Sequence, residues 1–136
     1  MVIVDTSVWV DVLRDASGRE RQALEGAVGE STVRLTRFTQ LELLQGARDE
    51  NEWGLLAAVL DTQDYVEASP DTWASAARVY FDLRRSGRTV RSPIDCCIAQ
   101  LAIDSGDLLL HRDRDFEVIA EVRPLRQMRL ARPRKR

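Results

Sequence analysis

The stretch Val2-Ile3-Val4-Asp5-Thr6-Ser7 starts with a short β-branched run that ends at an acid and two hydroxyl residues. A compact run of this kind predicts a buried strand. A carboxylate at a strand end such as Asp5 can cap the helix that follows, but Thr6 or Ser7 can do so too, which would leave Asp5 free for another role. A strand that leads directly into a helix is typical of β-α units, and repeated units of this kind build a parallel sheet.

The same alternation of strand and helix continues along most of the 136 residues. Further strands are expected at 32–35, 65–66, 108–110 and 122–125. Further helices are expected at 19–27, 40–47, 52–60, 70–85, 93–105 and 115–121. This pattern predicts one α/β domain at residues 1–128, a three-layer α/β/α arrangement around a central parallel sheet of four to five strands. A basic tail at 129–136 follows it.

Two of these helices carry clear sequence signals. We expect the helix at 70–85 to begin at Pro70 with Ser69 as its N-cap, because proline suits the first helical position. Its Trp73 is expected in the core or a subunit interface. In the helix at 93–105, Ile94 is expected to face inward.

Four acids, far apart in sequence, each stand near the start or end of an expected element. They are Asp5, Glu42, Asp95 and Asp113. Strand carboxyl ends and helix amino ends meet along one edge of a parallel sheet, so we expect these side chains to gather there. Carboxylates so close together repel one another unless a proton or a cation neutralises them. Oxygen-only ligation suits a hard ion such as Mg²⁺ or Mn²⁺, and a metal site is therefore predicted.

Some of the acids also have a purely structural explanation. Thr39-Gln40-Leu41-Glu42 and Ser92-Pro93-Ile94-Asp95 both match the capping box, which stabilises a helix start. The loop after 108–110 has two acids, Asp113 and Asp115, so that one can cap the next helix while the other binds a metal. Capping and metal binding do not exclude each other, because a capped helix end also faces the sheet edge.

Charge and cysteine content restrict the class of protein further. The net charge of −2 hides five cations and no acids in residues 129–136, so that residues 1–128 carry −7. The tail can either attract a polyanion or act as a solubilising end, and both interpretations stay open.

The cysteines are the neighbours Cys96 and Cys97, expected to be reduced. With no signal peptide or membrane-spanning stretch in evidence, a cytoplasmic protein is expected.

Several other chemistries are disfavoured. The chain lacks a phosphate-binding glycine loop, and its only histidine, His111, has no evident catalytic partner. A structural or supporting role is expected for it. A phosphoacceptor receiver domain would need a lysine at its acidic pocket, and the only lysine is Lys135 in the tail.

Four segments resemble, in order and spacing, the PIN-domain ribonucleases, and most closely the VapC toxins of bacterial type II toxin–antitoxin modules. These segments are I3-V4-D5-T6-S7-V8-W9, T39-Q40-L41-E42-L43-L44-Q45-G46, S92-P93-I94-D95-C96-C97-I98-A99 and H111-R112-D113-R114-D115-F116. The resemblance extends over residues 1 to about 125. It implies a Mg²⁺- or Mn²⁺-dependent endoribonuclease, a homodimer, and inhibition by a cognate VapB-like antitoxin.

The resemblance also implies roles for individual residues. Asp5, Glu42, Asp95 and Asp113 match the family's metal-binding acids, and Asp115 matches a second acid of the last motif. Thr6 or Ser7 matches a supporting hydroxyl. His111 stands where the family commonly has a small hydroxyl residue.

Phosphodiester hydrolysis of RNA at this metal site is the function that these features favour. Arg91, Arg112 and Arg114 flank the acids and are candidate ligands for substrate phosphates, although surface ion pairs would explain any one of them. A metal-dependent RNA-binding module that does not cleave is the alternative.

Overall fold

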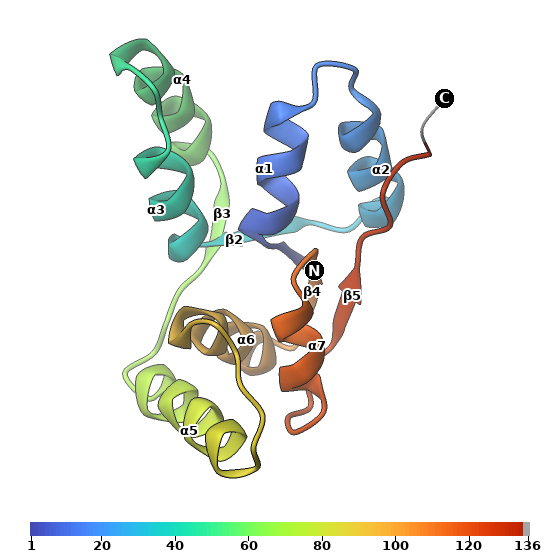
Figure 1. Cartoon of the computed structure of the whole chain (residues 1–136). Coiled ribbons are helices and arrows are strands. Elements are labelled where there is room, and N and C mark those ends of the chain that lie inside the picture. The colour runs from blue at the N-terminus through green and yellow to red at the C-terminus, as the bar shows by residue number, and fades with distance from the viewer. Residues whose placement is uncertain (135–136) are drawn as a thin grey trace.

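The computed structural model describes residues 1–134 and has a five-stranded sheet at its centre (Figure 1). All neighbouring strands are parallel, in the order β3-β2-β1-β4-β5. The strands are β1 (Val2–Val4), β2 (Val33–Thr36), β3 (Asp64–Val66), β4 (Leu108–His111) and β5 (Gln127–Arg129). The expected parallel sheet of four to five strands is confirmed.

Helices connect the strands along the whole chain. They are α1 (Thr6–Arg14), α2 (Arg19–Val28), α3 (Arg37–Gln45), α4 (Glu50–Asp61), α5 (Thr72–Arg85), α6 (Pro93–Ser105) and α7 (Arg114–Ala120). In Figure 1, α1 and α2 lie on one side of the sheet and α5, α6 and α7 on the other, while α3 and α4 form a pair beside α1. The expected three-layer arrangement is therefore present.

The core is split between the two faces of the sheet, as the alternation of side chains along a strand requires. Ile3 and Leu109 pack with α5, α6 and α7, where Phe116 is fully buried. Val4 and Leu110 pack on the other face with α1 and α2. Because the short central strands are buried on both faces, they consist almost entirely of large apolar residues.

The central strands β1 and β4 end in register, which brings the segments that follow them together. Val4 is paired with Leu110, and the Asp5 N–H donates to the Leu110 carbonyl at 2.9 Å. Asp5 therefore lies next to the loop that carries Asp113. The sheet edge predicted from the sequence is present at these two strand ends.

Some local expectations were wrong. Helix α5 begins at Thr72 rather than Pro70, because Ser69 and Thr72 close a turn first: the Ser69 N–H donates to the Thr72 hydroxyl at 3.0 Å. Ile94 is 41% exposed and does not face inward. Trp73 is 52% exposed, which excludes it from the core, and its place in a subunit interface stays a prediction.

The last strand also differs from its predicted position. The segment at 122–125 forms a turn after α7, in which the Val122 N–H donates to the Ile119 carbonyl at 3.0 Å, and β5 follows at Gln127–Arg129. The apolar character of Val122 and Leu125 reflects packing on the α5–α7 side rather than strand formation.

The first residues of the expected tail at 129–136 belong to the sheet and to the face that α1 and α2 cover. Arg129 belongs to β5, Leu130 is buried, and Arg132 lies 3.1 Å from Asp11 on α1. Lys135 and Arg136 lie outside the described residues. Within residues 1–134, none of the helices has the length and apolar character that crossing a bilayer requires.

Candidate active site

Three carboxylates form the tightest acidic cluster in the described part of the chain. Asp95, Asp113 and Asp115 each place one carboxylate oxygen within 4.8 Å of the other two. Asp95 lies in the first turn of α6, whereas Asp113 and Asp115 lie at the start of α7. The amino ends of two helices thus bring together acids from distant parts of the sequence.

Asp5 lies beside this cluster at the start of α1. It is the N-cap of α1, and its Oδ2 accepts from the Ser7 N–H at 3.0 Å and from the Ser7 hydroxyl at 2.6 Å. The expectation that Thr6 or Ser7 would cap this helix, leaving Asp5 free, was therefore wrong. One carboxylate oxygen of Asp5 caps the helix. The Ser7 hydroxyl donates to the same oxygen and so holds the acid in place instead of capping the helix itself.

Ser7 also connects Asp5 to the loop after β4. Its hydroxyl donates to Asp5 and accepts from the Arg112 N–H at 2.9 Å. A single hydroxyl therefore fixes the first acid relative to the segment that contains Asp113. This gives a physical basis to the supporting role predicted for Ser7.

The pKa of Asp5 shows how crowded the negative charges are. Burial raises this pKa most, the bonds from Ser7 lower it, and the charge of Asp113 raises it further. Asp5 and Asp113 are thus close enough to repel each other when both are ionised.

Glu42 reaches the same region from the middle of α3. The Thr6 hydroxyl lies 3.1 Å from Glu42 Oε1 and 2.9 Å from the hydroxyl of the buried Thr39. The pKa of Glu42 is raised, first by burial and then by the charge of Asp5, while the bond from Thr6 opposes the rise. Glu42 therefore lies on the Asp5 side of the site, beside the cluster of three aspartates.

The predicted capping box at Thr39 was wrong. Helix α3 begins three residues earlier, and its N-cap is Thr36, whose hydroxyl accepts from the Thr39 N–H at 3.3 Å. Thr39 faces Thr6 instead, so it supports Glu42 through the Thr6 hydroxyl. The sequence did contain a signal for this, since positions i and i+3 share one face of a helix.

The surroundings of Asp95 shift its pKa strongly. Ser92 caps α6 through the Ile94 N–H at 3.1 Å, Pro93 follows at the first position, and Asp95 occupies the first turn as expected. The pKa of Asp95 is raised to about 8, first by burial, then by a hydrogen bond with Asp115 and by the charges of Asp113, Asp115 and Asp5. A proton on Asp95 thus relieves the crowding in the metal-free protein.

Asp113 and Asp115 divide their tasks. Asp113 is the N-cap of α7 and accepts from the Asp115 N–H at 2.9 Å, so one acid of the pair is a cap, as expected. Asp115 Oδ2 accepts from the Arg91 N–H at 3.0 Å, which ties α7 to the loop before α6.

His111 has the supporting role expected for it. Its ring is fully buried, lies 5.1 Å from the ring of Phe116 and pairs with Gln127 at 2.7 Å through Nε2. Nδ1 accepts from the Asp113 N–H at 3.1 Å, so Nε2 carries the proton donated to Gln127. The histidine thus supplies a hydrogen bond next to Asp113.

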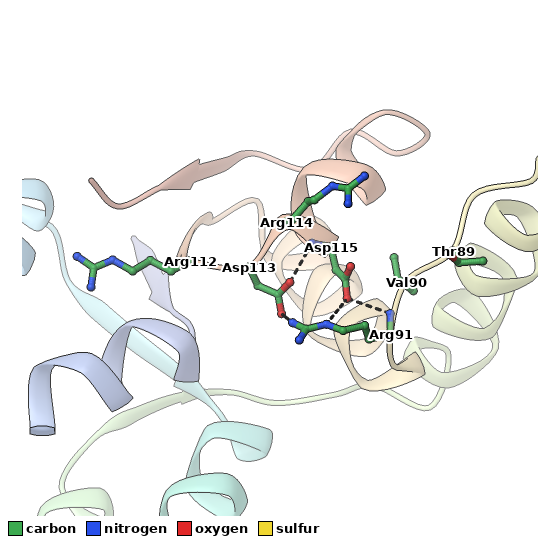
Figure 2. A pocket seen from close by; sticks show the side chains of 7 residues that line it. All are labelled: Thr89, Val90, Arg91, Arg112, Asp113, Arg114 and Asp115. Atoms are coloured by element: carbon green, nitrogen blue, oxygen red, sulfur yellow. Dashed lines mark hydrogen bonds and ion pairs between the residues drawn. The ribbon is translucent and has the colours of Figure 1, made fainter. Parts of the chain in front are cut away.

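The three candidate arginines occupy different environments (Figure 2). Arg91 NH2 lies 2.8 Å from Asp113 Oδ2, directly at the cluster. The Arg114 guanidinium points away from the carboxylates (Figure 2). The Arg112 side chain is 3% exposed and pairs with Asp11 at 2.8 Å and Glu20 at 2.6 Å, so its charge is used within the fold.

An open hollow lies in front of Asp113 and Asp115. Its volume is about 440 Å³, and its lining includes Val90, Arg91 and Arg114. The hollow is large enough for a nucleotide-sized group to approach the acids.

The raised pKa of Asp95 predicts a pH-dependent stability. The folded chain keeps this proton up to about pH 8, whereas the unfolded chain releases it near its ordinary value of 3.8. Between these values the folded state binds more protons, so the stability of the metal-free protein falls as the pH rises from about 4 to about 8. Asp95→Asn cannot ionise, and it should be more stable than wild type by about 1–3 kcal/mol at pH 8, a value reduced from the full shift because solvent screens the partly exposed Asp95. At pH 4 the two proteins should be nearly equal in stability.

Urea denaturation in a chelator at the two pH values measures this difference. Asp64→Asn is the matched control, because Asp64 is exposed at the start of β3, the opposite end of the strands. An Asp95→Asn variant no more stable than wild type at pH 8 would show that Asp95 is not crowded by its neighbours.

Comparison with known proteins places the fold and the site in a family. The model of the PIN domain family matches residues 2–122. "VapC ribonuclease Mb1587" from Mycobacterium bovis is 34% identical over 130 residues, which cover 90% of this chain and 93% of that protein. "Ribonuclease VapC51" from Mycobacterium tuberculosis is 32% identical over 120 residues, covering 88% and 85%.

Solved structures with a similar fold include chains from VapBC structures. VapBC2 from Rickettsia felis, bound to a DNA fragment from its promoter, superposes with a TM-score of 0.76 at 15% identity, covering 96% of this chain and all of that one. VapBC-1 from nontypeable Haemophilus influenzae gives 0.75 at 13% identity, covering 96% and 98%. The family match and the identity to the mycobacterial proteins show that the chain belongs to the PIN-domain family, among the VapC ribonucleases.

Proposed function

We propose that this chain is a divalent-metal-dependent endoribonuclease and the toxin of a toxin–antitoxin pair. The observation that carries the proposal is the convergence of Asp95, Asp113 and Asp115 within 4.8 Å, with Asp5 beside them. Its relatives are named ribonucleases, which supports RNA as the substrate. RNA in the cytoplasm is the target that we expect.

The donor set fits a hard divalent cation. Every candidate ligand is a carboxylate, and burial, a hydrogen bond with Asp115 and the charges of the neighbouring acids together raise the pKa of Asp95. We assign Asp5, Asp95 and Asp113 as the main ligands of Mg²⁺ or Mn²⁺, with Glu42 and Asp115 completing the site. When bound, such an ion acts as a Lewis acid on the phosphate and lowers the pKa of a water molecule.

The chain's own residues then have separable tasks. Glu42, whose pKa is raised by burial and by Asp5, has an alternative role to metal binding, which is to orient the attacking water and accept its proton. Thr6 holds the Glu42 carboxylate, and Ser7 holds Asp5. In the hydrolysis, the water oxygen bonds to phosphorus as the bond from phosphorus to the leaving sugar oxygen breaks, and that oxygen finally takes up a proton.

Positive side chains at the hollow are suited to hold the substrate backbone. Arg91 and Arg114 line the open hollow, and guanidinium groups bind phosphate oxygens through paired hydrogen bonds. Arg112 lines it as well, but its guanidinium is occupied by Asp11 and Glu20, so we assign it to stabilising the loop.

The central test is cleavage of total bacterial RNA by purified protein, read by sequencing of new 5′ ends. Wild type with Mn²⁺ should cleave at defined sites, and Asp95→Asn should cleave at least about 100-fold more slowly because a charged ligand is lost. Asp64→Asn removes a carboxylate far from the cluster and should retain full activity.

The alternative function makes a different prediction in the same assay. A module that binds RNA without cleaving it would yield no new 5′ ends but would still shift RNA on a gel with Mn²⁺. Cleavage that persists unchanged in a chelator or in Asp95→Asn would contradict metal-dependent hydrolysis at this site.

We also propose that a partner chain covers the apolar surface of α3 and α4. Leu41, Trp53, Leu55 and Val59 are 47–64% exposed on these two helices. Large exposed apolar side chains grouped on a surface mark protein interfaces. Similar folds were solved as VapBC complexes, which supports a VapB-like antitoxin as the occupant, alongside formation of a homodimer.

Leu55→Glu would bury a charge in this apolar contact. It should therefore lower, at least about tenfold, the amount of co-expressed antitoxin that co-purifies with the chain. Gln22→Glu adds the same charge to the exposed surface of α2 and should leave recovery unchanged. Equal recovery with both variants would exclude α4 from the antitoxin interface. Light scattering of the free chain determines separately whether it forms a dimer.

A further inference from the structure

Arg91 occupies the place at the acidic cluster where a cation is needed. Its NH2 donates to Asp113 Oδ2 at 2.8 Å, and its Nε lies 3.5 Å from Asp115 Oδ2. The guanidinium thus bridges two of the three clustered acids, as Figure 2 shows. The charge and hydrogen bond of Asp113 raise the pKa of Arg91, and Asp115 adds to this effect.

The contact uses an oxygen that a metal would need. Asp113 Oδ1 already accepts from the Asp115 N–H at 2.9 Å, and Oδ2 accepts from Arg91. Both carboxylate oxygens of Asp113 are therefore engaged by protein donors. An incoming divalent ion has to displace Arg91 or share Asp113 with it.

Displacing the side chain leaves the fold unchanged. The Arg91 side chain is 79% exposed, so it can rotate into solvent without unpacking the core. Its backbone is held independently, because the Arg91 N–H donates to Asp115 Oδ2 and the next residue, Ser92, caps α6. The anchored backbone keeps the guanidinium beside the hollow in either position.

From this geometry we propose that Arg91 is a built-in competitor of the divalent ion, which lowers the metal affinity of the site until it is displaced. Once displaced, the guanidinium is available to a substrate phosphate next to the same acids, so phosphate and metal favour each other's binding. This inference rests on the proposed metal-dependent function and concerns how that site is regulated.

The test is Mn²⁺ binding to metal-free protein at low ionic strength, measured from the electron paramagnetic resonance signal of free Mn²⁺. Arg91→Gln should bind Mn²⁺ about two- to fivefold more tightly than wild type, the size expected for loss of an exposed ion pair. Arg91→Lys keeps the charge and should stay closer to wild type. Higher salt should reduce the difference, because it screens the competing ion pair.

Arg88→Gln is the matched control. Arg88 lies on the same loop and pairs with Glu121 at 3.5 Å, outside the cluster, so this variant removes one positive charge without freeing Asp113. Circular dichroism melts check that all variants are folded. Adding a short uncleaved RNA analogue should tighten Mn²⁺ binding to wild type more than to Arg91→Gln.

The outcomes separate this inference from the proposed function. Tighter Mn²⁺ binding by Arg91→Gln but not by Arg88→Gln supports competition at Asp113. Unchanged or weaker binding by Arg91→Gln, or an equal gain in Arg88→Gln, overturns the competition while leaving the metal site intact. Absence of Mn²⁺ binding to wild type and Arg91→Gln alike overturns both the metal site and the competition.

Discussion

Electrostatic repulsion among carboxylates at one edge of a parallel sheet is the constraint on which the rest of this structure depends. Asp5, Asp95, Asp113 and Asp115 come from three separate parts of the chain, and each lies at or just inside the amino end of a helix. Asp5 and Asp113 each cap a helix and accept one of its first backbone N–H groups, which carry partial positive charge. The fold therefore tolerates the crowding through helix caps, the raised pKa of Asp95, which favours its protonated form, and the guanidinium of Arg91. A divalent cation would replace the last two of these.

The packing beneath the site explains why the crowding persists. The buried side chains of β1 and β4 hold their strand ends in register, so Asp5 cannot move away from the loop that carries Asp113. Ser7 and the buried guanidinium of Arg112 fasten this loop to α1 and α2. Most of the supporting contacts are thus buried, whereas Asp113 and Asp115 line the open hollow. This division lets the site bind ligands without a change in the core.

Much of this arrangement follows from sequence, and the remainder depends on distant contacts. The acids at strand ends and helix starts were predicted, because a parallel sheet brings those positions together. Glu42 was placed in a capping box, since the competing cap at Thr36 becomes evident only once the end of β2 is known. The ion pairs of the arginines join residues far apart in sequence: Arg112 pairs with Asp11 and Glu20, and Arg91 pairs with Asp113. Residue type alone does not distinguish such arginines from phosphate ligands. The helix-like turn at 122–125 was taken for a strand because short apolar segments fit both.

The most direct test of the central claim is a crystal structure of the protein with Mn²⁺, examined for anomalous scattering at the Mn edge. We expect a peak among the carboxylates of Asp5, Asp95 and Asp113, with the Arg91 guanidinium moved off Asp113. A peak elsewhere, or an acidic cluster that keeps its proton and Arg91 at saturating Mn²⁺, would contradict the assignment of these carboxylates as a metal site.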